Sequence, residues 1–225
     1  AGDVNRAQDE APREEMAVML RAKAAPAPPQ MQEESLFEYH LYTLDQPTTL
    51  KEKQTKQVAL LSAANIPVRK EFVLQGQSHY YSGSYGELGQ KLKVGVFVEF
   101  DNRTEARLGL PLPKGIVRVY KRDTDGRAQF IGEDRVDHTP KNETIRLKLG
   151  DAFDVTAKRK QTDFKKIGGS GRYNYIYESA FEVELRNAKK EAVTVNVLEP
   201  MPGDWEILQQ SHPSTKEASG TARFR

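Results

Sequence analysis

In the segment KLKVGVFVEF, residues 91–100, every second side chain is apolar, a period that is typical of a β-strand. Successive side chains of a β-strand point to opposite faces, so a period of two predicts a strand with one apolar face. Similar short runs, divided by Gly, Pro, Asn and Asp, follow one another through most of the chain. This punctuation is typical of antiparallel β structure. The apolar face of the segment consists of Leu92, Val94, Val96, Val98 and Phe100.

These runs predict about ten strands and an all-β fold. Asp125-Gly126 between two of the runs is a strong signal for a short hairpin. Two sheets that each carry one apolar face bury those faces against each other, so we expect an antiparallel β-sandwich. The predicted strands lie at 36–42, 56–62, 68–75, 91–100, 115–121, 127–133, 143–149, 153–162, 172–187 and 192–199, and 221–225 alternates like the start of another. The basic second half of 153–162 is expected to be an exposed edge.

The first 34 residues differ in character from the rest of the chain. Residues 9–24 have helical spacing and predict a short helix, and the proline-rich stretch 24–35 predicts an extended linker. We therefore expect a helical tail and Ala/Pro-rich linker over 1–34 and a β-sandwich domain over 35–225. The start at Ala1 and the strand-like end at Arg225 are those expected of a fragment of a longer protein.

Composition limits the classes of function. The chain has 34 basic and 32 acidic residues among 225, and a net charge of +2 gives no field that favours nucleic acid. It contains no cysteine, which excludes disulfides, thiolate metal sites and cysteine nucleophiles. It also contains no apolar run long enough for a transmembrane helix.

Known catalytic and metal-binding motifs are incomplete in this sequence. Ser82 and Arg172 each replace a glycine in the two segments that come nearest to a nucleophile elbow, SGSYG and GGSGR. The glycine-rich loop at 168–171 lacks the Gly-Lys-Ser/Thr of a phosphate loop. The four histidines are too far apart in sequence to form a local metal-ligand pair. We therefore predict no catalytic residue, no metal and no cofactor.

The segment EDRVDHTP, residues 133–140, combines acids, a histidine and a hydroxyl. Asp137, His138 and Thr139 are thus candidates for a polar site in a hydrolase of unrecognised type. The favoured interpretation is a strand end and turn, in which short polar side chains satisfy backbone groups. A bulge near residues 133–134 would explain why alternation fails there.

Tyrosines form two groups, and these are the candidate ligand or partner surface. One group is Tyr80, Tyr81 and Tyr85, and the other is Tyr173, Tyr175 and Tyr177. Rows of exposed tyrosines could stack on sugar rings or on a protein partner. The alternative is that the second group continues the apolar face of 181–185 and is core.

Four segments carry a resemblance to a known family. They are residues 35–61, 81–102, 110–164 and 203–208, which begin SLFEYHLY, YSGSYGEL, LPLPKGIV and GDWEIL. Their order and amino-acid sequences resemble the bacterial domain of unknown function 4139, the C-terminal β domain of proteins similar to mucoidy inhibitor A. The resemblance implies a periplasmic or cell-envelope location, a preceding coiled-coil region and missing final strands. It implies no activity, cofactor or catalytic residue.

Together these observations predict a non-enzymatic β-sandwich module of a bacterial cell-envelope protein. It would act in protein–protein interaction or scaffolding, and its partner would be another envelope protein or the rest of its own chain. One alternative is a carbohydrate-binding module that uses an exposed tyrosine surface. A second alternative is the unrecognised hydrolase.

Overall fold

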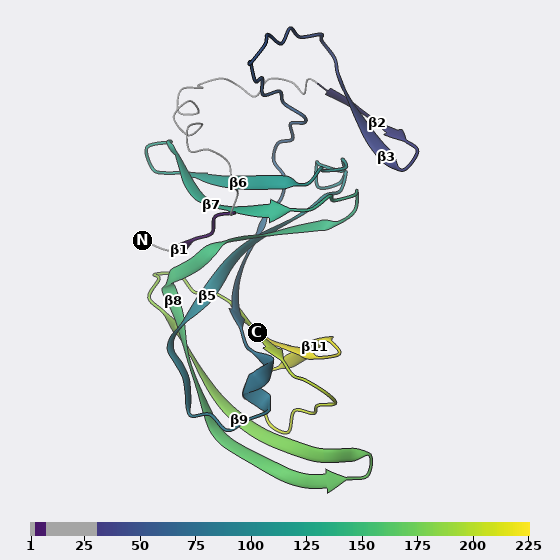
Figure 1. The fold of residues 1–225 in the computed structure, drawn as a ribbon. Coiled ribbons are helices and arrows are strands. Elements are labelled where there is room, and N and C mark those ends of the chain that lie inside the picture. Colours follow the sequence, from purple (N-terminus) through teal and green to yellow (C-terminus); the bar gives the residue numbers. More distant parts are fainter. Residues whose placement is uncertain (1–2, 8–30) are drawn as a thin grey trace.

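The computed structural model describes residues 3–7 and 31–225 (Figure 1). These residues form twelve strands and one 3-10 turn, η3 (Ser78–Tyr81), so the prediction of an all-β fold is confirmed. The helix expected over 9–24 lies outside the described residues, as does most of the predicted linker. Residues 31–34, expected as the end of that linker, instead begin a strand. No helix in the described part of the chain is long and apolar enough to cross a membrane.

The strands range from two residues to twenty-seven in length. They are β1 (Asp3–Val4), β2 (Met31–Leu36), β3 (Tyr39–Leu44), β4 (Arg69–Gln75), β5 (Glu87–Asp101), β6 (Gly115–Arg122), β7 (Ala128–Val136), β8 (Thr144–Ser170), β9 (Tyr173–Asn187), β10 (Val195–Pro200), β11 (Ser214–Ala218) and β12 (Thr221–Phe224).

One eight-stranded sheet dominates the fold. Its order is β1-β8-β5-β4-β10-β12-β11, with β9 paired to β8, while β2–β3 and β6–β7 form separate two-stranded sheets. The expectation of purely antiparallel pairing is wrong at one place, because β10 runs parallel to β4. This pairing joins segments more than a hundred residues apart, and such a crossover leaves no local sequence signal. A sandwich of ten strands is not confirmed.

Several predicted strand boundaries need correction. The run 36–42 is not one strand: it contains the turn between β2 and β3. Residues 56–62 form no strand, although they are apolar enough to resemble one. The runs 143–149 and 153–162 merge into the single strand β8, and strand pairing continues to Ser170. The expected bulge in β7 lies slightly earlier, where the register shifts opposite Val119 and Tyr120.

The core consists of two apolar clusters along the main sheet. The first joins β4, β5, β8 and β10 around Leu74, Val94 and Val155. The second lies where the β6–β7 hairpin packs on β8, around Ile145, Leu147 and Leu149. Both clusters use the faces that the period-two alternation predicts for their strands.

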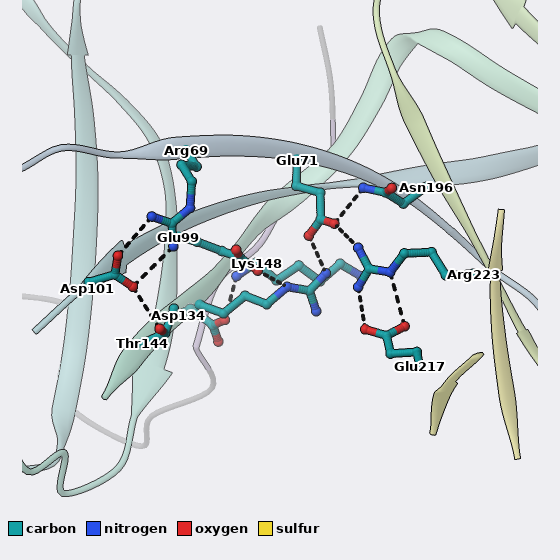
Figure 2. Close-up of polar contacts among 11 residues, drawn as sticks. Arg69, Glu71, Glu99, Asp101, Asp134, Thr144, Lys148, Asn196, Glu217 and Arg223 are labelled. Atoms are coloured by element: carbon teal, nitrogen blue, oxygen red, sulfur yellow. Dashed lines mark hydrogen bonds and ion pairs between the residues drawn. The ribbon is translucent and has the colours of Figure 1, made fainter. Parts of the chain in front are cut away.

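A charged network crosses the sheet on its polar side (Figure 2). Glu71 on β4 accepts hydrogen bonds from Arg146 on β8 and from Asn196 and Arg223 on β10 and β12. At one end of the network, hydrogen bonds from Arg69 and Thr144 lower the pKa of Asp101 to about 2. These hydrogen bonds therefore join β4, β5, β8, β10 and β12, which are distant from one another in sequence.

The distal part of the β8–β9 hairpin extends beyond the rest of the sheet. Strand β5 pairs with β8 only as far as Lys160. From there to the turn, β8 and β9 pair with each other alone, and Figure 1 shows this ribbon curving away from the sheet. We call residues 161–181 the β8–β9 arm. A two-stranded ribbon is marginally stable without further packing, so the groups that hold its base are important.

Candidate binding surface on the β8–β9 arm

Aromatic side chains follow one face of the arm. On β9 they occupy every second position except that of Ser179, and Phe164 joins them from β8. The rings of Tyr175 and Tyr177 lie 4.9 Å apart, and Tyr177 lies 5.4 Å from Phe164. The aromatic stripe, as we call it, consists of Phe164, Tyr173, Tyr175, Tyr177 and Phe181.

Two cations border the stripe near the arm's tip. Lys166 places its Nζ 5.5 Å from the ring centroid of Tyr175 and 6.0 Å from that of Tyr177. The guanidinium of Arg172 lies 5.0 Å from the ring centroid of Tyr173. Positive charge over an aromatic face is attracted by the ring quadrupole. The tip therefore presents aromatic and cationic groups together.

A carboxylate from the C-terminal region completes the tip. Asp204 accepts hydrogen bonds from the Tyr173 hydroxyl at 2.6 Å and from Arg172 at 3.0 Å. The Tyr173 hydrogen bond and the charge of Arg172 lower the pKa of Asp204, so this group is ionised near neutral pH. Tyr173, Arg172 and Asp204 form what we call the tip triad.

The two rings near the tip are more exposed than those at the base. Tyr175 is 54% exposed and Tyr173 is 39% exposed, whereas Tyr177 and Phe181 are half-buried. The tip rings are thus available for contact with another molecule. The rings nearer the sheet serve partly as packing.

The base of the stripe meets the other predicted tyrosine group. Tyr81 contacts Phe181 edge-on, with ring centroids 4.9 Å apart, although the two residues are a hundred positions apart in sequence. Tyr80, its neighbour in η3, is buried. The structure therefore places Tyr81 against the base of the stripe at Phe181, but it turns Tyr80 inward, away from any exposed surface.

A buried ion pair lies directly beneath these rings. Arg159 on β8 is 1% exposed and Glu199 on β10 is 5% exposed. Both terminal nitrogens of Arg159 donate to the Glu199 carboxylate, one of them at 2.8 Å, while its Nε has no partner in the described residues. The Tyr81 hydroxyl donates to the same carboxylate at 2.5 Å. We call Arg159, Glu199 and Tyr81 the base triad.

Burial and charge fix the protonation of the base triad. Burial alone would lower the pKa of Arg159, but the hydrogen bonds and charge of Glu199 outweigh it and keep that pKa above its ordinary value. Burial and the neighbouring Glu199 carboxylate raise the pKa of Tyr81 far above its ordinary value. Arg159 therefore keeps its positive charge and Tyr81 keeps its proton, and both donate hydrogen bonds to Glu199.

Tyr80 and Gly76 pack closely against the triad. The Tyr80 ring lies 5.2 Å from the Arg159 guanidinium carbon. A Cβ at Gly76 would lie 2.5 Å from a Glu199 carboxylate oxygen, so only glycine fits there without a shift. Gln161, also buried, donates to the carbonyls of Tyr80 and Gly83. These contacts fasten the segment 76–86 to the base of the arm.

Tyr85 occupies an intermediate position. Its backbone nitrogen donates to the Gln161 side chain, and its ring lies 5.7 Å from that of His79. The ring is 39% exposed, like that of Tyr173. Tyr85 therefore borders the base of the arm from the outside, where it can add to a contact surface.

The candidate polar site at the end of β7 is organised as a turn. The backbone nitrogen of His138 donates to the Asp137 carboxylate, and the Thr139 hydroxyl donates to the Asp137 carbonyl, both at 2.8 Å. The His138 ring is exposed and accepts a hydrogen bond of 3.4 Å from the Lys114 backbone nitrogen. Each side chain is thus used to satisfy nearby backbone groups. This geometry assembles no nucleophile and base.

Sequence reasoning missed the most buried members of this region. Arg159 and Gln161 fall in the stretch expected to be an exposed basic edge, and the structure shows that expectation to be wrong for both. Alternation could have predicted their burial, because Arg159 and Gln161 continue the alternate positions of Val155 and Ala157, all of them buried. Lys166 lies opposite Tyr177 in the hairpin, so the hairpin register brings it to the stripe. Asp204 gave no signal, because only the tertiary fold brings it to the tip.

Comparisons with protein-family models, with curated proteins and with solved structures found no match for this chain. Among the described residues, no group of three or more His, Asp or Glu side chains is placed to hold a metal ion. The geometry of the site is an exposed aromatic and cationic tip, supported by a buried ion pair and a tyrosine hydroxyl at the base.

Proposed function

We propose that this chain is a non-enzymatic binding and scaffolding module that contacts a protein partner through the aromatic stripe. The observation that carries the proposal is the exposure of Tyr173 and Tyr175 on an arm that extends beyond the main sheet. Tyrosine and arginine are enriched at the energetic centres of protein interfaces. The arm places both types at a position that a partner can reach.

The resemblance to the domain of unknown function 4139 gives this proposal its setting. On that basis we propose a bacterial cell-envelope or periplasmic module, part of a longer protein similar to mucoidy inhibitor A. Its partner would be an envelope protein or another part of its own chain. The packing of β6–β7 on β8 supports a sandwich-like arrangement at that end of the domain.

The test is capture of a partner from envelope extract with the 225-residue chain as bait. Tyr175→Ser should lose the captured protein, because it removes the most exposed ring of the stripe. Ile176→Ser is the matched control, since Ile176 is the next residue on β9, also exposed, and points to the opposite face. Equal capture by both variants, or capture of nothing by the wild type, would contradict the proposal.

A carbohydrate is the second candidate ligand, and the tip triad is the observation that favours it. Sugar sites combine an aromatic ring with polar groups that bind hydroxyls, and Asp204 and Arg172 provide such groups beside Tyr173. Calorimetric titration with envelope polysaccharide fragments would test it. Binding that is lost in Asp204→Ala would favour the glycan over the protein partner.

A further inference from the structure

The β2–β3 hairpin ends in an exposed apolar tip. Phe37 at the turn is 89% exposed, and Leu36 and Tyr39 beside it are exposed as well. Phe37 also has a φ of +57°, in the left-handed region that bulky residues rarely adopt. The two-residue turn between Leu36 and Tyr39 accounts for this φ. The ring itself packs little against its own chain, so it is available for contact with another molecule.

The rest of the hairpin gives this tip a fixed base. All six residues of β2 pair in regular register with β3. The Tyr42 hydroxyl donates to the Pro111 carbonyl at 3.0 Å, which ties the hairpin to the segment before β6. The tip is therefore presented on an ordered support.

The hairpin is acidic, and the stripe on the arm is bordered by a lysine, Lys166. Residues 31–44 contain three glutamates and no lysine or arginine, and one of the three, Glu33, already pairs with His40. Residues 164–175 of the arm and its turn contain Lys165, Lys166 and Arg172 and no acid. Lys165 pairs with Asp163 and lies near Glu178, and Arg172 pairs with Asp204. Of the three cations, Lys166 lies beside Tyr175 and Tyr177 and faces the stripe, where an acid of another molecule can approach it.

We propose that the Phe37 tip of one copy of this chain docks on the aromatic stripe of a second copy. Phe37 and Tyr39 would pack against Tyr175 and Tyr177, where edge-to-face contacts between rings are favourable. Glu38, next to Phe37, would approach Lys166. This inference rests on the proposed function and names a second copy as the partner of the stripe.

The positions of the two surfaces require that the contact be between copies. Figure 1 shows the β2–β3 hairpin and the arm at opposite ends of the molecule. One chain therefore cannot place its own tip on its own arm. The contact is heterologous, with a different surface on each side, so repeating it produces a ring or an open chain of copies.

Sedimentation of the 225-residue chain over a concentration series tests this directly. A series that reaches about 0.5 mM would populate an interface with a Kd of about 0.1 mM. We expect association that grows with concentration and weakens as salt is raised, because opposite charges meet. Phe37→Gly and Tyr175→Ser should each raise the Kd about tenfold or more, whereas Ile176→Ser should leave it unchanged.

Phe37→Gly has a particular advantage as a test. Glycine adopts positive φ readily, so this variant removes the ring while relieving the backbone strain. A loss of association in Phe37→Gly therefore cannot be attributed to unfolding of the hairpin. Circular dichroism of the variant should match that of the wild type.

Mixing the two variants gives the sharpest result. Phe37→Gly keeps an intact stripe and Tyr175→Ser keeps an intact tip, so an equimolar mixture should form dimers and nothing larger. A wild type that stays monomeric across the series, or a mixture that stays monomeric when the wild type associates, would overturn the inference.

Two further outcomes separate this inference from the proposed function. A monomeric wild type that still captures an envelope partner through Tyr175 would overturn only the self-docking. Flotation with lipid vesicles, lost in Phe37→Gly, would assign the tip to a membrane surface and would also overturn it. Binding to an anionic lipid surface is disfavoured, because the hairpin contains three glutamates and no lysine or arginine.

Discussion

The base and the tip of the β8–β9 arm carry the same three chemical groups in opposite environments. At the base, Arg159 and the Tyr81 hydroxyl share the Glu199 carboxylate in the interior. At the tip, Arg172 and the Tyr173 hydroxyl share the Asp204 carboxylate in solvent. Each arginine also lies over a tyrosine ring.

The difference between the two triads lies in what surrounds them. Removing one partner of a buried ion pair strongly destabilises the fold, because the remaining charge stays in a medium that solvates it poorly. An exposed pair contributes little, because water solvates both charges. The base triad therefore supports the fold, and the tip triad is free to contact a ligand.

Arg159→Met should show the largest effect, a loss of about 3–5 kcal/mol in the free energy of unfolding, because Glu199 would remain buried without its partner. Chemical denaturation monitored by circular dichroism measures this loss. Arg172→Met at the tip is the matched control and should change stability by less than about 0.5 kcal/mol. Adding Glu199→Gln to Arg159→Met should recover part of the loss, since it removes the unpaired charge. Similar effects of the two arginine substitutions would refute the contrast between base and tip.

Tyr81→Phe should lower the free energy of unfolding by about 1.5–3 kcal/mol, because the hydroxyl donates to a buried charged group. Its control, Tyr173→Phe, removes an exposed hydrogen bond to Asp204 and should have a much smaller effect.

The same substitution predicts a change in pH dependence. The pKa of Tyr81 is raised in the folded state, so the folded protein holds the proton that the unfolded chain loses above its ordinary pKa near 10. Stability from this group is complete below pH 10 and declines as the pH rises further. Unfolding experiments between about pH 9 and 11 should show a shallower decline for Tyr81→Phe than for the wild type. Equal slopes would show that Tyr81 titrates normally and is not held by Glu199.

Gly76→Ala should lower the free energy of unfolding by about 1–3 kcal/mol, because the added methyl group would clash with the Glu199 carboxylate and displace it. Gly168→Ala is the control at the tip, since a Cβ there has open space. Thermal unfolding of both variants measures the difference. An unaffected Gly76→Ala would mean that the carboxylate can move without loosening its contacts with Arg159.

Part of this picture could be predicted from the sequence because it depends on local periodicity. Alternation identified the strands β4 to β7 and the apolar faces of β8 and β10, such as Ile145, Leu147 and Leu149. It also placed the odd-numbered tyrosines of β9 on one face. These are properties of a strand that do not depend on its neighbours.

The remainder could not be predicted, because it depends on which strands become neighbours. The parallel pairing of β10 with β4 brings Glu199 beside Gly76, and the pairing of β5 with β8 ends at Lys160. Arg159 looked like part of a solvated basic edge because its partner lies forty residues away. Alternation with Val155 and Ala157 places Arg159 on the buried face, but it does not identify Glu199 as the acid that pairs with it.

Tyr175→Ser should have the smallest effect on stability, within about 0.5 kcal/mol, because the ring is mostly exposed and its removal leaves no buried group without a partner. Its effect should appear instead in binding: capture of the partner should be lost, while Ile176→Ser retains it. Denaturation and capture measured on the same two variants separate the two roles. If Tyr175→Ser destabilised the chain as much as Tyr81→Phe, the whole stripe would be core. Tip and base would then be one structural unit, because the distinction between them requires that a ring at the tip can be removed at almost no cost to folding.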